Sequence, residues 1–310
     1  MDKKTPGVRN TARRRKPAGH RKPADHRKAS YRRFGIQAAA ALLQNANFKG
    51  FFTGKIYDGP IKQVCVPGLN CYSCPGAVGA CPIGSLQNIL GGLRFRIPYY
   101  VLGILIFFGA LLGRAVCGFL CPFGWLQELL HKIPFYKKKR FKADKALRTV
   151  KYFVLAATLL LPLFVKLTPF FCKYLCPSGT LAGVLLSASN SAVRGQLGWL
   201  FTWKAAVLLA LVAASLVIWR PFCKYLCPLG AIYGFFNRIA LYRMDFHASA
   251  CVHCGACAKV CRMNVDPAKT PNSMECIRCG DCVHACPQGA LRLGFRHGDS
   301  ENRQKMKAEE

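Results

Sequence analysis

Eight cysteines near the C-terminus constrain this chain more than any other feature. They form two runs, each spaced C-x2-C-x2-C-x3-C, and Pro287 follows the second run. A [4Fe–4S] cluster takes four thiolates, and in this spacing the fourth cysteine of each run ligates the other run's cluster. Gly255 and Gly280 fit turns that bring the backbone close to a cluster. The spacing therefore assigns one cluster to Cys251, Cys254, Cys257 and Cys286, and the other to Cys276, Cys279, Cys282 and Cys261. Zinc, which C-x2-C pairs also bind, is the alternative.

The composition indicates a membrane protein that binds metal. The chain has 310 residues, is 52% hydrophobic and carries a formal net charge of +32. Basic residues confined to one side of a membrane reconcile these values. Nucleic-acid binding is disfavoured, because the cations flank apolar runs and no nucleic-acid-reading motif occurs. The 18 cysteines stand mostly in Cys-Pro and C-x2-C contexts, which favours metal over the disulfide framework of a short secreted chain.

Four apolar runs predict membrane spans, which need about 20 largely apolar residues. The expected spans cover residues 34–52, 97–113, 150–171 and 198–219. The first is the weakest, because Gln37, Gln44 and Asn45 interrupt it near one helical face. We consider these three side chains a candidate quinone contact, with hydrogen bonds between helices as the alternative. A cleaved signal peptide is the alternative for this first run.

Lysine and arginine predict the orientation. The tail 1–33 and the loop 132–148 are strongly basic, and two expected spans separate them. Both therefore lie on the cytoplasmic side, and the less basic loops 54–96 and 172–197 face outward. We expect a disordered tail over 1–33, a membrane domain over 34–242, a cluster domain over 243–295 and a polar tail over 296–310. The protein would then be a multi-pass protein of the cytoplasmic membrane, with both termini in the cytoplasm.

The membrane domain contains an internal repeat. Cys-Pro-x-Gly occurs at 81–84, 121–124, 176–179 and 227–230, and the last three copies extend to C-x3-C-P. Each element predicts a turn into a short returning helix, buried within an inverted repeat. Consecutive elements should alternate between the two faces, so the cytoplasmic face would bring together Cys117, Cys121, Cys223 and Cys227. The outer face would hold six candidate ligands, Cys65, Cys71, Cys74, Cys81, Cys172 and Cys176. The alternatives are packing turns with buried apolar sulfurs and, in the outer loop, a Cys65–Cys71 disulfide.

Two resemblances follow from these motifs. Residues 251–287 resemble a bacterial two-cluster ferredoxin, although Arg262 stands where the first run usually has proline. The stretch VPGLNCYSCPGAVGACPIGSLQ (66–87), the C-x3-C-P elements and the terminal ferredoxin resemble polyferredoxin-like membrane proteins of the NapH type, with NosR-like and CcoG-like relatives. This likeness covers most of residues 34–290. It implies an electron-transfer subunit that passes electrons between quinol or cytoplasmic carriers and a partner enzyme.

The expected fold is an all-α membrane domain with about four transmembrane helices, short Cys-Pro half-helices and inverted repeats, joined to a small α+β ferredoxin-like domain with two [4Fe–4S] clusters. We expect further iron–sulfur or metal sites at the C-x3-C-P cysteines, and as partners membrane lipid, redox proteins and a quinone, with no nucleic acid. No acid–base or nucleophilic catalytic residue is indicated, which favours an electron-transfer subunit over a stand-alone enzyme. The alternative is a maturation or regulatory membrane protein that reduces a metal ion for cofactor assembly. A metal transporter has no evident need for the eight ferredoxin cysteines.

Overall fold

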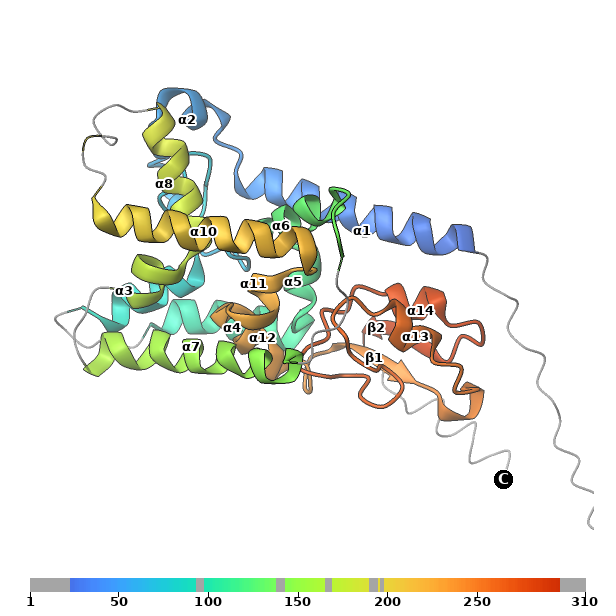
Figure 1. The fold of residues 1–310 in the computed structure, drawn as a ribbon. Coiled ribbons are helices and arrows are strands. Elements are labelled where there is room, and N and C mark those ends of the chain that lie inside the picture. The colour runs from blue at the N-terminus through green and yellow to red at the C-terminus, as the bar shows by residue number, and fades with distance from the viewer. Residues whose placement is uncertain are drawn as a thin grey trace, which may run out of the picture.

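The chain folds into a helical body with a smaller C-terminal part that carries a two-stranded sheet (Figure 1). The structure, a computed structural model, describes residues 23–92, 98–137, 143–164, 169–189, 195 and 198–295. Three expectations fall outside these residues: the tail over 296–310, the first 22 residues of the basic tail, and the structure of the loop cations Lys138, Lys139, Arg140 and Lys142.

Two of the four expected spans are helices long and apolar enough to cross a membrane. They are α7 (Asp144–Phe164) and α10 (Trp199–Val217). Only 17% of the most apolar stretch of α7 and 6% of that of α10 are buried inside the protein, whereas the core helix of a soluble protein is mostly buried. Both helices therefore present apolar faces to their surroundings.

The other two expected spans differ from the prediction. Helix α4 (Tyr99–Leu112) has 14 residues, or about 21 Å of helix. Pro98 precedes it and Gly113, at φ +55°, ends it. The first apolar run is divided between α1 (Pro23–Gln44) and α2 (Phe48–Thr53), because the chain leaves the helix at Asn45 to Asn47. Within the residues it describes, the structure thus gives two candidate spans where the sequence predicts about four. Helix α1 also begins inside the tail that was expected to be disordered over residues 1–33.

Each Cys-Pro-x-Gly element opens a helix, as the sequence predicts. These helices are α3 (Pro82–Leu90), α6 (Pro122–Lys132), α8 (Pro177–Ser189) and α12 (Pro228–Phe236). Proline at the first helical position lacks an N–H that would be unpaired there in any case. In two of the four the preceding cysteine sulfur caps the helix: the Gly230 N–H donates to Cys227 Sγ at 3.3 Å and the Gly179 N–H to Cys176 Sγ at 3.4 Å. The motif therefore directs a sulfur to a helix N-terminus.

Short helical turns carry the first cysteine of each C-x3-C-P element. They are α5 (Ala115–Phe119), the π-helical turn η2 (Phe171–Leu175) and α11 (Pro221–Tyr225). A 3-10 turn, η1 (Pro60–Gln63), lies in the loop that precedes α3. The three elements contribute to one hydrophobic core that includes Cys117, Cys176 and Cys223.

The C-terminal part closes on itself through a two-stranded antiparallel sheet. Strand β1 (Tyr242–Phe246) pairs with β2 (Leu291–Phe295), with Tyr242 opposite Phe295. Between the strands lie the short helices η3 (Ala248–Ala250), α13 (Ala256–Val260) and α14 (Asp281–Ala285). The core of the helical body continues into this part through Met263, Val265 and Ile277. The α+β character expected for the ferredoxin-like region is confirmed.

Candidate metal centres

The two halves of the ferredoxin-like part repeat the same backbone geometry. Gly255 and Gly280 cap α13 and α14 in the left-handed conformation, at φ +71° and +84°. Two residues before each glycine, His253 and Arg278 also have positive φ, of 52° and 54°. A third pair, Asn264 and Gly289, follows each fourth cysteine by three residues, at 54° and 63°. Each run thus wraps its cysteines by the same sequence of turns.

The ferredoxin cysteines line two separate cavities in the interleaved order predicted from spacing. A cavity of about 340 Å³ is lined by Cys251, Cys254, Cys257 and Cys286. A second, tighter cavity of about 20 Å³ is lined by Cys261, Cys276, Cys279 and Cys282. In both, the fourth cysteine comes from the other run. The first group includes the exposed Cys254, whereas Cys282 of the second is buried.

The four cysteines expected at the cytoplasmic face also form one group, which we call the inner group. Its members are Cys117, Cys121, Cys223 and Cys227, each 5 or 6% exposed. Cys227 lies within electrostatic range of the other three. Gln127 donates from Nε2 to Cys223 Sγ at 3.1 Å. Two C-x3-C-P elements more than 100 residues apart thus direct their sulfurs to one buried place, which supports ligation over unrelated packing turns.

Four of the six outer candidates form a second group, which we call the outer group. Cys71, Cys81, Cys172 and Cys176 line a cavity of about 360 Å³. The two Cys-Pro-x-Gly elements contact these sulfurs: a Cβ at Gly84 would lie 3.7 Å from Cys172 Sγ, and one at Gly179 would lie 3.8 Å from Cys71 Sγ, both ordinary van der Waals distances. The group joins the loop before α3 with the η2–α8 element (Figure 1).

The remaining two outer candidates lie elsewhere. Cys65 is buried, pairs in an isolated bridge with Ala80 and has its sulfur 3.6 Å from the Ser85 hydroxyl. Cys74 is partly exposed and is not among the residues that line the outer cavity. None of the 18 cysteines forms a disulfide, so the alternative of a Cys65–Cys71 disulfide is not what the structure contains.

The three polar residues of the first run all make hydrogen bonds within the protein. Gln37 is fully buried and donates to the Cys121 carbonyl at 3.1 Å. Gln44 donates to the Leu120 carbonyl at 2.8 Å, and Asn45 donates to the Ala41 carbonyl at 2.9 Å. Gln37 and Gln44 therefore attach α1 to the turn between α5 and α6. These contacts favour the interhelical alternative, and the quinone contact stays a prediction.

Buried aromatic side chains link the outer and inner groups. Phe171, next to Cys172, has its ring centroid 6.3 Å from that of Phe222, next to Cys223. Tyr233 is fully buried within electrostatic range of inner cysteines and of Cys81, and its hydroxyl donates to the Pro67 carbonyl at 3.0 Å. The two groups are thus joined through packed side chains.

Backbone contacts link the inner group to the ferredoxin-like part. A Cβ added at Gly118, next to Cys117, would lie 2.7 Å from the carbonyl oxygen of Ile277, next to Cys276. Only glycine allows the two backbones to approach so closely. Asn237 reinforces the contact by donating to the Cys276 carbonyl at 2.7 Å. The four groups therefore follow one another along the molecule, from the outer group to the exposed ferredoxin group.

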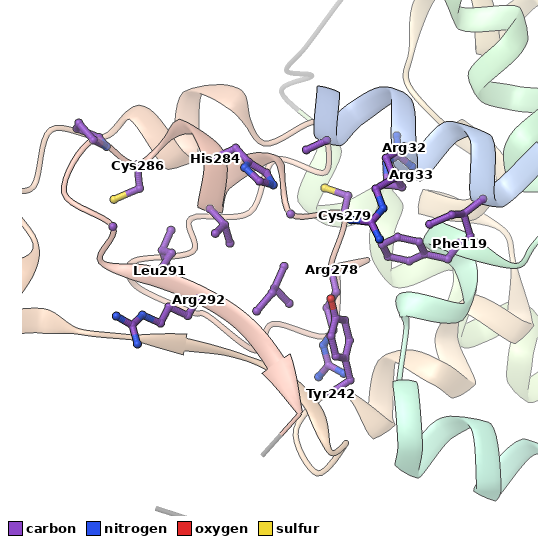
Figure 2. A pocket seen from close by; sticks show the side chains of 17 residues that line it. Arg32, Arg33, Phe119, Tyr242, Arg278, Cys279, His284, Cys286, Leu291 and Arg292 are labelled. Atoms are coloured by element: carbon purple, nitrogen blue, oxygen red, sulfur yellow. The ribbon is translucent and has the colours of Figure 1, made fainter. Parts of the chain in front are cut away.

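A basic pocket of about 810 Å³ lies between α1 and the ferredoxin-like part (Figure 2). Figure 2 shows Arg32 and Arg33 on α1 facing a wall that carries Cys279, with Cys286 at the far end. Among the described residues, four arginines line it, Arg32, Arg33, Arg278 and Arg292, and no carboxylate does. The pocket thus combines positive charge with access to a cysteine of each ferredoxin group.

The cysteine groups suit clusters better than single ions. A zinc ion holds its sulfurs at about 2.3 Å, which draws the ligands close together. Within the described ranges, no three His, Cys, Asp or Glu side chains are arranged to hold one metal ion. Two of the groups instead surround cavities of about 340 and 360 Å³ with four sulfurs each, as a larger four-iron core requires.

Burial disfavours thiolates without metal. Burial, reinforced by the Asp281 carboxylate, raises the pKa of the Cys279 thiol, and burial with the nearby Cys279 raises the pKa of Cys282. Coordination to iron supplies the positive charge that deprotonates such thiols. Cluster binding and proton release are therefore coupled at this site.

The sequence analysis did not single out Arg114 and Arg220. Each lies three residues before the first cysteine of an inner element, and both are fully buried. The repeated pattern R-x2-C-x3-C-P was the available signal. The outer element has Pro169 in this place.

Comparison with protein families gives matches along most of the helical body. A family described as 4Fe-4S binding domain matches residues 79–100, 98–142, 150–193 and 199–247, which together make up more than half of the chain. A second family with the same description matches residues 270–292, within the ferredoxin-like part. No solved structure shows significant similarity to the chain.

Three relatives are similar to parts of this chain. YccM of Escherichia coli K12, provisionally named an electron transport protein, is 30% identical over 69% of this chain and 62% of its own length. The methylamine utilization ferredoxin-type protein MauN of Paracoccus denitrificans is 29% identical over 57% of this chain and 58% of its own. The regulatory protein NosR of Pseudomonas aeruginosa is 29% identical over 49% of this chain and 20% of its own. The chain therefore belongs to the 4Fe-4S binding domain family: it is a polyferredoxin-like iron–sulfur protein, related to NosR, that binds [4Fe–4S] clusters and takes part in electron transfer.

Proposed function

We propose that the protein is a membrane-bound relay that carries electrons through four [4Fe–4S] clusters, one in each cysteine group. The observation that carries this proposal is the gathering of 16 of the 18 cysteines into four groups of four. The groups are connected by the Phe171–Phe222 contact and by the approach of Gly118 to Ile277. Helices α7 and α10 would cross the cytoplasmic membrane beside the relay, with the ferredoxin-like part in the cytoplasm.

Iron and acid-labile sulfide per chain, measured on anaerobically purified protein, test this proposal. Four clusters require about sixteen irons, whereas the ferredoxin-like part alone requires about eight. The Cys223→Ser and Cys172→Ser variants should each lose about four irons, and the matched Cys65→Ser variant should lose none. A wild-type value near eight would refute metal at the membrane cysteines.

The electron donor or acceptor on the cytoplasmic side is, we propose, an anionic carrier protein. The arginines of the basic pocket, of which Arg32 and Arg292 are exposed, support this choice through their charge. Opposite charges speed encounter between redox partners, and salt screens the effect. Cluster reduction by an acidic two-cluster ferredoxin should slow in Arg32→Glu and Arg292→Glu, and should remain unchanged in the control Lys145→Glu, outside the pocket. Equal rates in all three variants would contradict this docking site.

Quinol is the partner we propose within the membrane. A change in the cluster electron paramagnetic resonance (EPR) spectrum on addition of a reduced quinol analogue would support it. Clusters that stay unchanged at a matched potential would exclude quinol.

Reduction of a metal ion for cofactor assembly is the second candidate function. The observation in its favour is the pair Cys71 and Cys74, of which only Cys71 lines the outer cavity. Cys74 would then be available to an incoming ion. The Cys74→Ser variant should lose metal reduction while it keeps its iron and its cluster reduction. Full metal reduction in this variant would reject the role of Cys74.

A further inference from the structure

Two arginines connect the inner C-x3-C-P elements reciprocally. Arg114, from the first element, donates from Nη2 to the carbonyl of Cys223 in the second, at 2.9 Å. Arg220, from the second element, donates from Nη1 to the carbonyl of Cys117 in the first, at 2.5 Å. Each guanidinium thus binds the first cysteine of the opposite element.

The glycines of the inner Cys-Pro-x-Gly motifs lie against these guanidinium groups. A Cβ at Gly124 would lie 3.0 Å from Arg220 Nη1, which is a tight contact, and one at Gly230 would lie 3.5 Å from Arg114 Nη2, an ordinary van der Waals distance. In the outer group the equivalent glycines face sulfurs instead. The two arginines therefore occupy matching positions on either side of the inner group.

Both cations are only partly compensated. Arg114 shares Glu275 with the buried Lys151, and its Nη1 lies 2.9 Å from Glu275 Oε2. Arg220 shares Glu128 with the buried Arg33, and its Nη2 lies 3.0 Å from Glu128 Oε1. Each network has two cations for one carboxylate, so each side of the inner group carries a formal excess of one positive charge.

The backbone at Arg220 indicates that the side chain is needed there. Arg220 has φ 49° and ψ 55°, a left-handed conformation that arginine adopts at a cost. Glycine would occupy this position without strain. The hydrogen bonds to Cys117 and to Gln37 Oε1, at 2.9 Å, offset the cost.

The outer group lacks this arrangement. Pro169 replaces the arginine of the motif. Lys204, which is partly exposed, donates to the Cys172 carbonyl at 3.3 Å. Lys62 also lies within electrostatic range of Cys71, but its amine donates to the Ala77 carbonyl rather than to a cysteine. The outer group thus has one cysteine carbonyl bound by a partly exposed lysine, whereas the inner group has two bound by fully buried arginines.

We propose that Arg114 and Arg220 are positioning residues that hold the reduction potential of the inner cluster above that of the outer cluster. This inference rests on the proposed presence of a cluster in each group. Reduction adds one electron and one negative charge to a cluster, without making or breaking a bond. A buried cation stabilises that charge strongly because the surrounding dielectric is low, and charge and hydrogen bonding around a cluster set its potential. Two buried cations therefore favour the reduced state of the inner cluster.

A redox titration followed by EPR spectroscopy on the full chain tests the proposal. The signal of the inner cluster is identified by its loss in Cys117→Ser, and that of the outer cluster by its loss in Cys172→Ser. Arg114→Gln and Arg220→Gln should each shift the inner signal to more negative potential. Only Arg220→Gln should leave the ferredoxin signals in place, because Arg114 also lies within electrostatic range of Cys276. Lys204→Gln is the matched control, and should shift the outer signal alone.

Arg114→Lys and Arg220→Lys keep the positive charge, and they replace the glutamine variants if those fail to assemble the inner cluster. The lysine variants should keep the reduction potential of the inner cluster closer to the wild-type value than the glutamine variants do. An inner potential at or below the outer one in the wild type would overturn the inference, as would an unshifted inner signal in glutamine variants that keep their iron. A wild-type iron content near eight would instead refute the proposed clusters themselves.

Discussion

Asn237 is the residue whose replacement should most directly separate the ferredoxin-like part from the helical body. It ends α12 and is fully buried. Its Nδ2 donates to the carbonyls of Ser273 and Cys276, at 2.8 and 2.7 Å. Its Oδ1 accepts from the Arg114 backbone N–H at 2.8 Å. One amide therefore ties α12 and the start of α5 to the loop that carries a ferredoxin cysteine.

The Asn237→Ala variant leaves one donor and two acceptors without this partner. Each buried polar group that loses its hydrogen bond costs about 1–3 kcal/mol. We therefore expect the free energy of unfolding to fall by about 4 kcal/mol, which corresponds to a drop in melting temperature on the order of 10 °C.

Thermal unfolding of the anaerobic protein in detergent, followed by circular dichroism, measures this change. The matched control is Asn45→Ala, which removes one hydrogen bond to Ala41 at the end of α1. The control should lower the melting temperature by no more than about 3 °C, the effect of roughly 1 kcal/mol. If Asn237→Ala has the same melting temperature as Asn45→Ala, the Asn237 amide does not join the ferredoxin-like part to the helical body as the contacts indicate.

Three further predictions use the same preparations. Glu275→Gln leaves Arg114 and Lys151, both fully buried, without a carboxylate, and should destabilise the fold by about 3 kcal/mol. The control is Asp245→Asn, which breaks the Arg243–Asp245 pair, whose side chains are 36 and 51% exposed. It should cost less than about 1 kcal/mol in the same melting assay. Phe222→Leu should slow reduction of the outer cluster from the ferredoxin side without loss of iron, and an unchanged rate in rapid-mixing experiments would exclude the ring as part of the path. Cys71→Ser should lose about four irons per chain while Cys74→Ser keeps them all, and equal losses would place Cys74 among the ligands.

Covalent spacing determines the ferredoxin-like part almost completely. Cysteines separated by two residues lie close together along the chain, and the doubled C-x2-C-x2-C-x3-C spacing predicts the two interleaved groups that line separate cavities. The turns at Gly255 and Gly280 follow from the same constraint, because each run must bend back on itself within a few residues. Ligation by the named cysteines remains a prediction until iron is measured.

The helical body was less predictable. The repeat predicts that the two C-x3-C-P pairs Cys117/Cys121 and Cys223/Cys227 meet, and the structure places them together. The number of spans was not accessible from apolar runs alone. In the described part of the chain two helices are both long and apolar enough for crossing, while Pro98 and Gly113 limit α4 and the Asn45–Asn47 turn divides the first run. Hydrophobicity reports preference for lipid, whereas helix length depends on local backbone signals.

By itself, the sequence determined the iron–sulfur chemistry, the two ferredoxin groups and the pairing of the inner elements, because each follows from short-range spacing or from an internal repeat. Only the tertiary structure selected Cys71, Cys81, Cys172 and Cys176 from six outer candidates and left Cys65 and Cys74 aside, since no periodicity in the 65–81 loop says which sulfurs face the cavity. It alone also showed that Arg114 and Arg220 reach across to each other's cysteine carbonyls. Contacts between residues 100 positions apart depend on how the helices pack.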